Sequence, residues 1–418
     1  MSNSQYSDHL IKDKKIGIVG GGPAGIVLTR LLQQRGANVK LYERDIDRTA
    51  RVQGGSLDIH DDSGQLAIKD AGVYDEFLKK IRPGGGHHSV VDKYAVVQFL
   101  MPDLKCFNSR PEIDRGDLRE IFIDSLEPDT VMWNHHLQDV IMNEDNSGIL
   151  LKFKGGKEEV VDFLVGADGY ASKIRPFVTN VEPIYSGILF IQTEIDNPKE
   201  VCPTVYSWVN GGNMFGLSDG KFVAAQQKTS GSMVVYFSSR KDENFAKESN
   251  LLGNDRELVR QYLLKEYSDW DPVFLDLIKE ATKAPVTVRN LSDTARFNNI
   301  NNWRVNSRVT LVGDCAHVMP PFAGDGANMA MMDSLELARE LTSLSNKTME
   351  EAIENYQTKM LKRTKESGND TNKSLDDLHS PRALESFVSM ILPGPFKVYD
   401  LYVYYFKSSK QQTKEKEN

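Results

Sequence analysis

A glycine-rich turn near the start of the chain limits the folds that this sequence can adopt. The apolar run Lys14 to Gly20 leads into Gly20-Gly-Gly-Pro-Ala-Gly25, and Pro23 to Gln34 then carries aliphatic residues at helical spacing. Asn38 to Glu43 alternates as a second strand. A strand, a tight turn, a helix and another strand predict a βαβ unit with a right-handed crossover, and therefore a Rossmann-like opening.

Gly20, Gly22 and Gly25 have the GxGxxG spacing of a dinucleotide site. The first glycine permits the tight turn, the second lets the backbone approach a pyrophosphate, and the third lets the helix pack on the strand. Glu43 ends the next strand at the interval expected of an acid that binds a ribose, which favours the adenosine half of FAD or NAD over NADPH. A turn with only a structural role is the alternative. The glycines do not choose between FAD and NAD.

A second glycine-rich segment far downstream favours a flavin. Gly313 and Asp314 follow the apolar strand Val309 to Val312, so the Asp314 carboxylate can meet ribityl hydroxyls. The glycines and the helical turn that come next can offer backbone amides to the electron-rich end of a flavin ring. A solvated Asp in a turn is the alternative. The residues expected to supply these amides are Gly324, Gly326, Ala327 and Asn328.

Composition is ordinary for a globular protein. A chain of 418 residues exceeds one ordinary core, so we expect two packed domains. The net charge of −8 disfavours nucleic acid as a partner. Met1 to Asp13 is polar, and no apolar run has the length of a membrane span, so we expect a cytoplasmic protein without stable membrane association. Cys106, Cys202 and Cys315 form no CxxC or zinc spacing, so redox chemistry needs a cofactor and no metal is expected.

The residue pattern also predicts how the chain is divided. Between Glu182 and Arg240, apolar runs alternate with Gly, Asn and Ser turns, which predicts an antiparallel sheet inserted into the α/β nucleotide-binding domain. The expected strands are Ile188 to Ile195, Thr204 to Val209, Lys221 to Ala225 and Met233 to Ser239, and Glu158 to Val165 is expected as one strand before them. We predict a discontinuous FAD-binding domain at 1–181 and 285–370, a substrate-binding sheet domain at 182–284, and a C-terminal helix and tail at 371–418.

The chain resembles the FAD-dependent aromatic hydroxylases, also called group A flavoprotein monooxygenases. The motifs that carry the resemblance are Gly20-Gly-Gly-Pro-Ala-Gly25, Asp168-Gly169 and Gly313-Asp314, in the order and spacing of the family, across Lys14 to Leu344. Within the family the chain is most similar to the TetX-type tetracycline-degrading monooxygenases. The runs that carry this closer similarity are Tyr42 to Arg51, Gly54 to His60 and Met319 to Gly324.

This resemblance implies roles for particular residues. By it, FAD would be held by Arg44, Asp58, Arg115, Asp168 and Asp314, in addition to the glycines and Glu43. Arg51 would meet the incoming NADPH, which would bind transiently because only one complete GxGxxG is present. The implied substrate contacts are Gln192, Asn213, Pro321, Phe322 and Gly324. Tetracycline-degrading members present basic side chains where this chain has Asn213 and Val234, which leaves the substrate open.

The implied function is a monooxygenase that acts on an aromatic or polyketide-like small molecule. NAD(P)H would reduce FAD, O2 would add to give a C4a-hydroperoxyflavin, and one oxygen atom would pass to the substrate, with tetracyclines among the candidates. A flavin halogenase would show a WxWxIP motif, and the tryptophans of this chain are widely separated. A flavin-holding protein that sequesters a ligand without turnover is the alternative.

A histidine beside the flavin motif and the C-terminal segment each have more than one interpretation. His317, beside the flavin motif, fits either a hydrogen-bonded loop residue or a proton shuttle. Leu375 to Met390 is similar to the C-terminal helix that bridges the two domains, and Val398 to Phe406 fits a packed bridge better than a membrane contact. We expect a monomer.

Overall fold

The predicted βαβ unit opens the structure. The computed structural model describes residues 9–50, 54–101, 110–143, 148–294 and 302–391. β1 (Lys15–Val19), α1 (Pro23–Gln34) and β2 (Asn38–Tyr42) agree closely with the predicted ranges. They belong to a five-stranded parallel sheet of order β17-β11-β1-β2-β7. The other strands are β7 (Val131–Met132), β11 (Phe163–Gly166) and β17 (Val309–Leu311).

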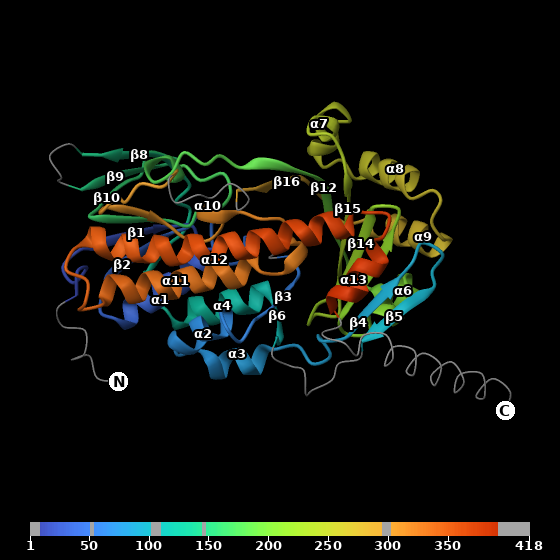
Figure 1. The fold of residues 1–418 in the computed structure, drawn as a ribbon, viewed down its shortest axis with the longest axis horizontal. Coiled ribbons are helices and arrows are strands. Elements are labelled where there is room, and N and C mark those ends of the chain that lie inside the picture. The colour runs from blue at the N-terminus through green and yellow to red at the C-terminus, as the bar shows by residue number, and fades with distance from the viewer. Residues whose placement is uncertain (1–8, 51–53, 102–109, 144–147, 295–301, 392–418) are drawn as a thin grey trace.

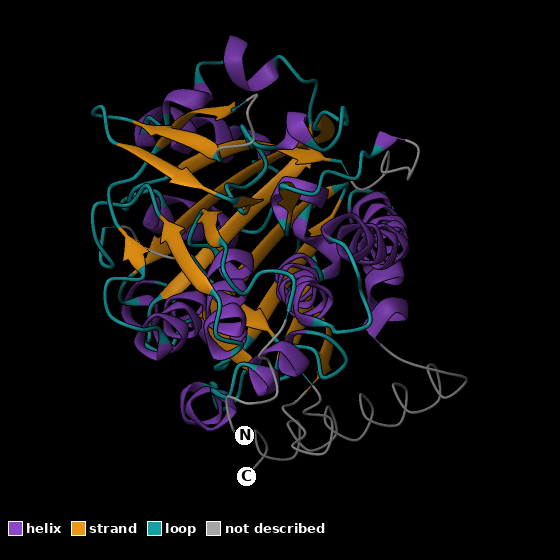
Figure 2. Ribbon diagram, turned by 90° about the vertical axis from the view of Figure 1, so that its left-hand side faces the viewer, coloured by secondary structure: helices purple, strands orange, loops and turns teal. Residues whose placement is uncertain are grey.

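Helices flank this parallel sheet, and the strands lie inside the molecule (Figures 1 and 2). α11 packs beside α1, and α12 lies along α11 (Figure 1). Aliphatic side chains of β1, α1 and α11 form one continuous core here. The helices of this part are α2 (Gly64–Asp70), α3 (Tyr74–Lys80), α4 (Arg115–Ser125), α10 (Asp314–His317), α11 (Gly326–Thr342) and α12 (Met349–Leu378), with short 3₁₀ turns η3 (Arg175–Phe177) and η7 (Pro321–Ala323).

The single strand predicted over Glu158 to Val165 is wrong, because the structure divides it. β10 (Glu158–Val161) pairs with β9, whereas β11 pairs with β1. Between them, the Asp162 carboxylate accepts a hydrogen bond from Lys15 N over 2.7 Å. The polar residue marks the point where the chain leaves one sheet for another. The small sheet contains β8 (Leu137–Met142), β9 (Ile149–Phe153) and β10, and a two-stranded sheet contains β3 (Ser56–Asp58) and β6 (Glu112–Asp114).

The predicted second sheet is present and is larger than its sequence pattern indicated. It has seven strands in the order β16-β12-β15-β14-β13-β4-β5, and all pairs are antiparallel except β13 with β4. Strands from 88–101 and 287–293 join it from outside the predicted range 182–284. Its strands are β4 (His88–Val91), β5 (Val97–Met101), β12 (Ile184–Ile195), β13 (Asn213–Ser218), β14 (Lys221–Gln227), β15 (Met233–Arg240) and β16 (Thr287–Asp293). The domain limits themselves stay a prediction.

The strand predicted at Thr204 to Val209 is wrong, because this segment is helix α6 (Pro203–Val209). Pro203 occupies the first helical turn, where its missing N–H costs nothing. Val205 and Val209 lie four residues apart and are buried on one helical face, whereas Asn210 ends the helix in the left-handed region. The remaining helical segments here are α5 (Pro198–Val201), α7 (Phe245–Glu248), η4 (Leu251–Gly253), α8 (Arg256–Glu266) and α9 (Pro272–Ala281).

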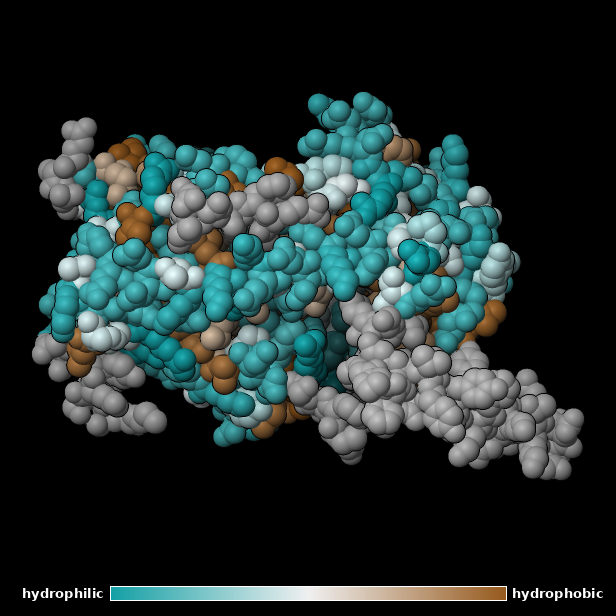
Figure 3. Space-filling model, in the orientation of Figure 1, coloured by the Kyte–Doolittle hydropathy of each residue, from teal (hydrophilic) through white to brown (hydrophobic). Residues whose placement is uncertain are grey.

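Helix α12 bridges the two large sheets. Its first half contributes Tyr356 and Met360 to the core around the parallel sheet, and its last turn contributes Leu375 and Leu378 to the core on the seven-stranded sheet. The single helix predicted at Leu375 to Met390 is interrupted, because α12 ends at Leu378 and α13 (Ala383–Ile391) starts after a turn. Figure 3 shows a mainly hydrophilic face with a hollow between the two bodies that α12 joins. In the described part of the chain, no helix has the length and apolarity of a membrane span.

His379 attaches the end of α12 to the seven-stranded sheet. Its Nδ1 donates to Leu375 O over 2.9 Å, and its Nε2 accepts from Ser238 Oγ on β15 over 2.9 Å. The ring is buried, and burial lowers the pKa of His379 from 6.5 to about 4. The imidazole is therefore neutral in the folded protein near neutral pH.

We expect the stability of the fold to decrease as the pH falls from 6.5 towards about 4. In that window the unfolded chain binds a proton at His379 and the folded chain does not, so protons favour unfolding. The full effect is roughly 3 kcal/mol of unfolding free energy. Thermal midpoints measured across this window should fall less steeply for His379→Gln than for the exposed control His136→Gln. If the thermal midpoint changed equally with pH in the two variants, His379 would not be the group that causes the loss of stability.

Candidate functional site

The sequence motifs follow neighbouring strands of the parallel sheet. Gly20 follows β1, Asp168 lies two residues after β11, and Gly313 lies two residues after β17. These strands are adjacent and parallel in the order β17-β11-β1. Their carboxyl ends therefore meet at one edge of the sheet, which is where ligands bind in open α/β folds.

The β1–α1 turn has the geometry that its glycines predict. Gly20 has a φ of +106°, and a Cβ there would lie 2.1 Å from Ala167 O. A Cβ on Gly25 would lie 1.9 Å from Gly20 O, so the helix can approach the strand only with glycine at this position. A Cβ on Gly22 would meet nothing within 4 Å. Open space therefore lies beside the start of α1, where a phosphate would interact with free amides.

Glu43 is buried behind this turn. Its Oε2 accepts from Gly21 N over 2.6 Å, and its Oε1 accepts from Asp45 N over 2.9 Å. The carboxylate thus organises the loop that follows β1, and the ribose contact stays a prediction. Arg44 is exposed beside it, and Arg51 lies outside the described residues.

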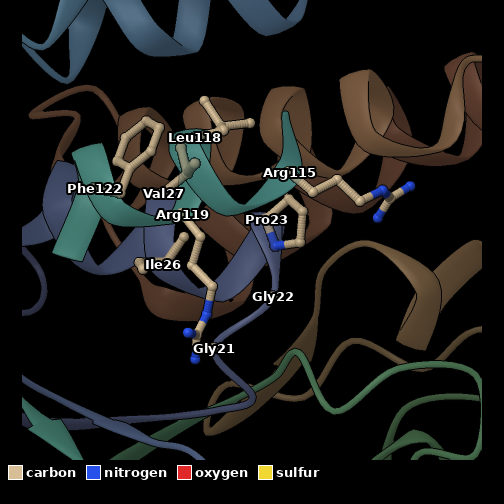
Figure 4. A pocket seen from close by; sticks show the side chains of 9 residues that line it. All are labelled: Gly21, Gly22, Pro23, Ile26, Val27, Arg115, Leu118, Arg119 and Phe122. Carbon is tan, nitrogen blue, oxygen red and sulfur yellow. The ribbon is translucent and has the colours of Figure 1, made fainter. Parts of the chain in front are cut away.

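A pocket lies beside the β1–α1 turn, between α1 and α4 (Figure 4). In Figure 4, the Arg119 side chain extends towards Gly21, whereas Arg115 points in a different direction. Arg119 also donates to Arg48 O over 2.9 Å and stacks on Trp133 with 5.1 Å to the ring centroid. The pocket combines cations with an apolar wall. Its lining residues are Gly21, Gly22, Pro23, Ile26, Val27, Arg115, Leu118, Arg119 and Phe122.

Cys315 joins the Asp168-Gly169 loop to the Gly313-Asp314 loop. Its thiol donates to Asp168 Oδ1 over 3.0 Å, and Gly169 N donates to its sulfur over 3.1 Å. Arg175 Nε donates to Cys315 O over 2.7 Å. Burial raises the pKa of the Cys315 thiol well above its usual value, which keeps it a proton donor. The cysteine count gave no signal for this contact, because its partner is distant in sequence.

Asp314 is the first residue of α10. Its side chain is exposed, yet surrounding protein raises the pKa of its carboxyl by desolvation, while His317, Arg115 and Arg175 oppose this effect. The side chain stays in contact with water, so its oxygens can accept hydrogen bonds from ligand hydroxyls.

Asp58 belongs to a second cluster, at the start of α11. Its Oδ2 lies 2.9 Å from His60 Nε2, and a Cβ on Gly324, whose φ is +76°, would lie 3.3 Å from its Oδ1. Asn328 is buried and fastens this cluster, since its Nδ2 donates to Asp58 O and its Oδ1 accepts from His60 N, each over 2.9 Å. Gly326 and Ala327 lie with Asn328 in the first turn of α11, and a Cβ on Gly326 would meet nothing within 4 Å.

Gln192 on β12 lies close to the loop that contains Gly54. A Cβ on Gly54 would lie 3.5 Å from Gln192 Nε2 and 3.8 Å from Arg115 Cδ, so these side chains converge on one loop. Tyr236 lies opposite Gln192 on β15, and a Cβ on Gly55 would lie 2.4 Å from its hydroxyl. Tyr236 is not among the contacts predicted from the sequence. A usable signal was that Tyr236 and Ser238 share one face of the predicted strand Met233 to Ser239.

Other predicted substrate contacts have internal partners. Asn213 is 4% exposed, and its Nδ2 donates to Glu112 Oε1 over 3.1 Å. Glu112 is also paired with Arg82 over 3.1 Å. Phe322 is buried against His379, with ring centroids 4.8 Å apart, while Pro321 is exposed. The roles of these residues in substrate binding stay predictions.

His317 is a buried, hydrogen-bonded residue behind the Gly313-Asp314 loop. Its Nε2 lies 2.5 Å from Asp333 Oδ2, and Arg363 Nη2 donates to Asp333 Oδ1 over 2.6 Å. Burial alone would lower the pKa of His317, but the charge of Asp333 raises this pKa above its ordinary value. Among the two alternatives for His317, the geometry favours the structural one.

The residues at this edge of the sheet fit a flavin dinucleotide. Two helices, α1 and α11, start at glycines with open space beside them, which lets a bulky anionic or electron-rich group reach their amides. Asp314 offers an acceptor at the start of α10, and Arg115 offers a forked cation in the pocket beside the start of α1. The apolar pocket wall suits a ring system.

A family profile described as "FAD binding domain" matches residues 13–367. The monooxygenase asqM of Emericella nidulans is 27% identical over 378 residues, which cover 79% of this chain and 84% of that relative.

Solved structures with a similar fold include flavin enzymes. Klebsiella pneumoniae HpxO complexed with FAD and uric acid superposes with a TM-score of 0.73 at 19% identity, over 90% of this chain and 92% of that one. The tetracycline destructase Tet(51) superposes with a TM-score of 0.66 at 21% identity, over 90% and 94%. At these identities the likeness shows the fold alone.

Proposed function

Because this chain belongs to the FAD binding domain family and is a FAD-dependent monooxygenase, we propose that it oxygenates an aromatic or polyketide-like small molecule with NADPH and O2. The observation that carries this proposal is the convergence of three motif loops at the carboxyl ends of β17, β11 and β1. Bound there, FAD would supply the redox chemistry of the reaction.

The side chains around the site have binding and orienting roles. The amides of the first turns of α1 and α11 would hold the pyrophosphate and the ring of FAD, and Asp314 would accept from its ribityl hydroxyls. Arg115 would neutralise negative charge near Gly54. Arg51 is proposed to meet NADPH during a transient visit.

The substrate is proposed to lie between these loops and the face of the seven-stranded sheet that carries Gln192 and Tyr236. Aromatic side chains line this face, for example Phe190, whose ring centroid is 5.4 Å from that of Tyr236. A flat, apolar substrate would be stabilised by such a wall. The fold shared with Tet(51) supports tetracyclines as candidates. Asn213 and Val234 are uncharged and buried. These two positions therefore offer no cation to bind the enolate of a tetracycline.

A turnover assay tests the proposal. The purified protein should bind FAD, and NADPH oxidation should accelerate when an aromatic library that includes tetracyclines is added under O2. Mass spectrometry should show a product that has gained one oxygen atom, labelled when ¹⁸O2 is used. If flavin and ligands bind and no flavin reduction or product follows, the protein is a sequestering protein.

We expect Gln192→Ala to lower kcat/KM for an accepted substrate about tenfold, because it removes a neutral hydrogen bond at the substrate wall. FAD affinity should be unchanged. Gln98→Ala is the matched control, since Gln98 lies on the edge strand β5 of the same sheet and donates to Asp92. Equal kinetics for both variants would place the substrate elsewhere.

A further inference from the structure

Helix α12 donates several hydrogen bonds to α11 and its N-cap residue, and two of them lead on to the motif loops. Arg363 Nη2 donates to Asp333 Oδ1 over 2.6 Å, and Ser367 Oγ donates to Asp325 Oδ2 over 2.8 Å. Asp333 lies within α11, and Asp325 is its N-cap residue. Arg363 and Ser367 are one helical turn apart and therefore lie on the same face of α12.

The first of these contacts continues to the Gly313-Asp314 loop. Asp333 Oδ2 accepts from Gly313 N over 2.9 Å, and the Asp333 side chain is completely buried. Gly313 has a φ of +64°, so this hydrogen bond supports a backbone conformation that few other residues adopt. Asp314 is the next residue. Asp333 therefore links Arg363 to the backbone of the loop that carries Asp314.

The second contact continues to Asp58. Asp325 Oδ1 lies 3.8 Å from His60 Nδ1, and His60 Nε2 lies 2.9 Å from Asp58 Oδ2. Ser367 thus fixes one oxygen of the N-cap residue of α11 while the other faces a buried imidazole. The first turn of α11 and the Asp58 side chain, both assigned to FAD, are connected to α12 by this route.

The far end of α12 is fixed to the other sheet. Leu375 and Leu378 pack on the seven-stranded sheet, and His379 is bonded to Ser238 on β15. One rigid helix therefore spans from the substrate-facing sheet to two loops of the cofactor site (Figure 1).

We propose that Arg363 and Ser367 are positioning residues for FAD, acting through Asp333 and Asp325. The inference rests on the proposed FAD site. Neither side chain needs to touch the cofactor: each holds an acid that orients a cofactor loop, and α12 sets the distance of those loops from the substrate-facing sheet.

Ser367→Ala is the main test, because it deletes one hydroxyl and leaves the helix able to fold. We expect the Kd of the apoprotein for FAD, measured by flavin fluorescence, to rise about tenfold. The FAD-induced increase in thermal midpoint should shrink, since it depends on affinity, while the midpoint of the apoprotein changes little. Arg363→Met should weaken FAD binding further, and Arg363→Lys should restore part of it.

Thr364→Ala is the control. Thr364 is as buried as Ser367 and lies next to Arg363 on α12, but its hydroxyl donates to Met360 O of its own helix over 2.8 Å. It should bind FAD like the wild type. Wild-type affinity in Ser367→Ala, or equal losses in Ser367→Ala and Thr364→Ala, would overturn the inference. A wild-type protein that does not bind FAD would instead refute the proposed function.

Discussion

Gly25→Ala should yield a protein that no longer retains FAD. The new methyl group would lie 1.9 Å from Gly20 O and 3.1 Å from Ala167 Cβ, so the start of α1 must move away from β1. The free amides of α1 then lose their position relative to the loops after β11 and β17. We expect at least a hundredfold loss in FAD affinity, about 3 kcal/mol, visible as a colourless purified protein.

Gly253→Ala is the matched control for this substitution. Gly253 lies in η4, far from the motif loops in sequence, and a Cβ there would meet nothing within 4 Å. This variant should be as yellow as the wild type. If Gly25→Ala retained stoichiometric FAD, the β1–α1 turn would not be the dinucleotide site.

Asp333→Ala should destabilise the fold by about 3–5 kcal/mol, because the buried His317 loses the carboxylate that pairs with it and Arg363 keeps only Glu336 as its acidic partner. Asp333 accepts from Arg363, His317 and Gly313 N, and its side chain has no exposed surface. Burial alone would raise the pKa of Asp333, but His317 and Arg363 hold this pKa below its ordinary value. The carboxylate is therefore charged in the fold, and each partner depends on that charge. The thermal midpoint of the apoprotein measures the effect.

Asp376→Ala tests whether burial of the ion pair is the reason for the large loss of stability expected in Asp333→Ala. Asp376 forms an equally short ion pair with Arg240, 2.6 Å long, but both side chains are largely exposed, at 64% and 46%. An exposed pair is worth about 0–1 kcal/mol, so the midpoint should barely change. Similar midpoints for Asp333→Ala and Asp376→Ala would show that the buried network contributes little.

Local patterns predicted the nucleotide-binding part well. The β1, α1 and β2 ranges follow from apolar periodicity and from glycines whose backbone demands are visible in the sequence, such as Gly20 with its positive φ. Prediction failed where a local pattern fitted two structures. Thr204 to Val209 has β-branched and aromatic residues typical of a strand, yet Pro203 and packing against the sheet make it a helix.

The candidate site was less predictable, because its contacts join residues that are distant in the chain. Cys315 binds Asp168, which is 147 residues away, and Asn328 binds Asp58, which is 270 residues away. No spacing rule connects such pairs. Tyr236, His60 and Arg363 also join the site through partners that only the tertiary structure brings close, and for His60 that partner is Asn328, 268 residues away.

The sequence by itself determined that three motif loops follow strands of a nucleotide-binding sheet, because turns, helix starts and strands depend on neighbouring residues. It therefore determined the cofactor class. Only the tertiary structure decided how the seven-stranded sheet recruits β4, β5 and β16, and which side chains lie near the loop that contains Gly54 and Gly55. It also decided that α12 holds those loops through Arg363 and Ser367, because burial and charge pairing are properties of the packed chain.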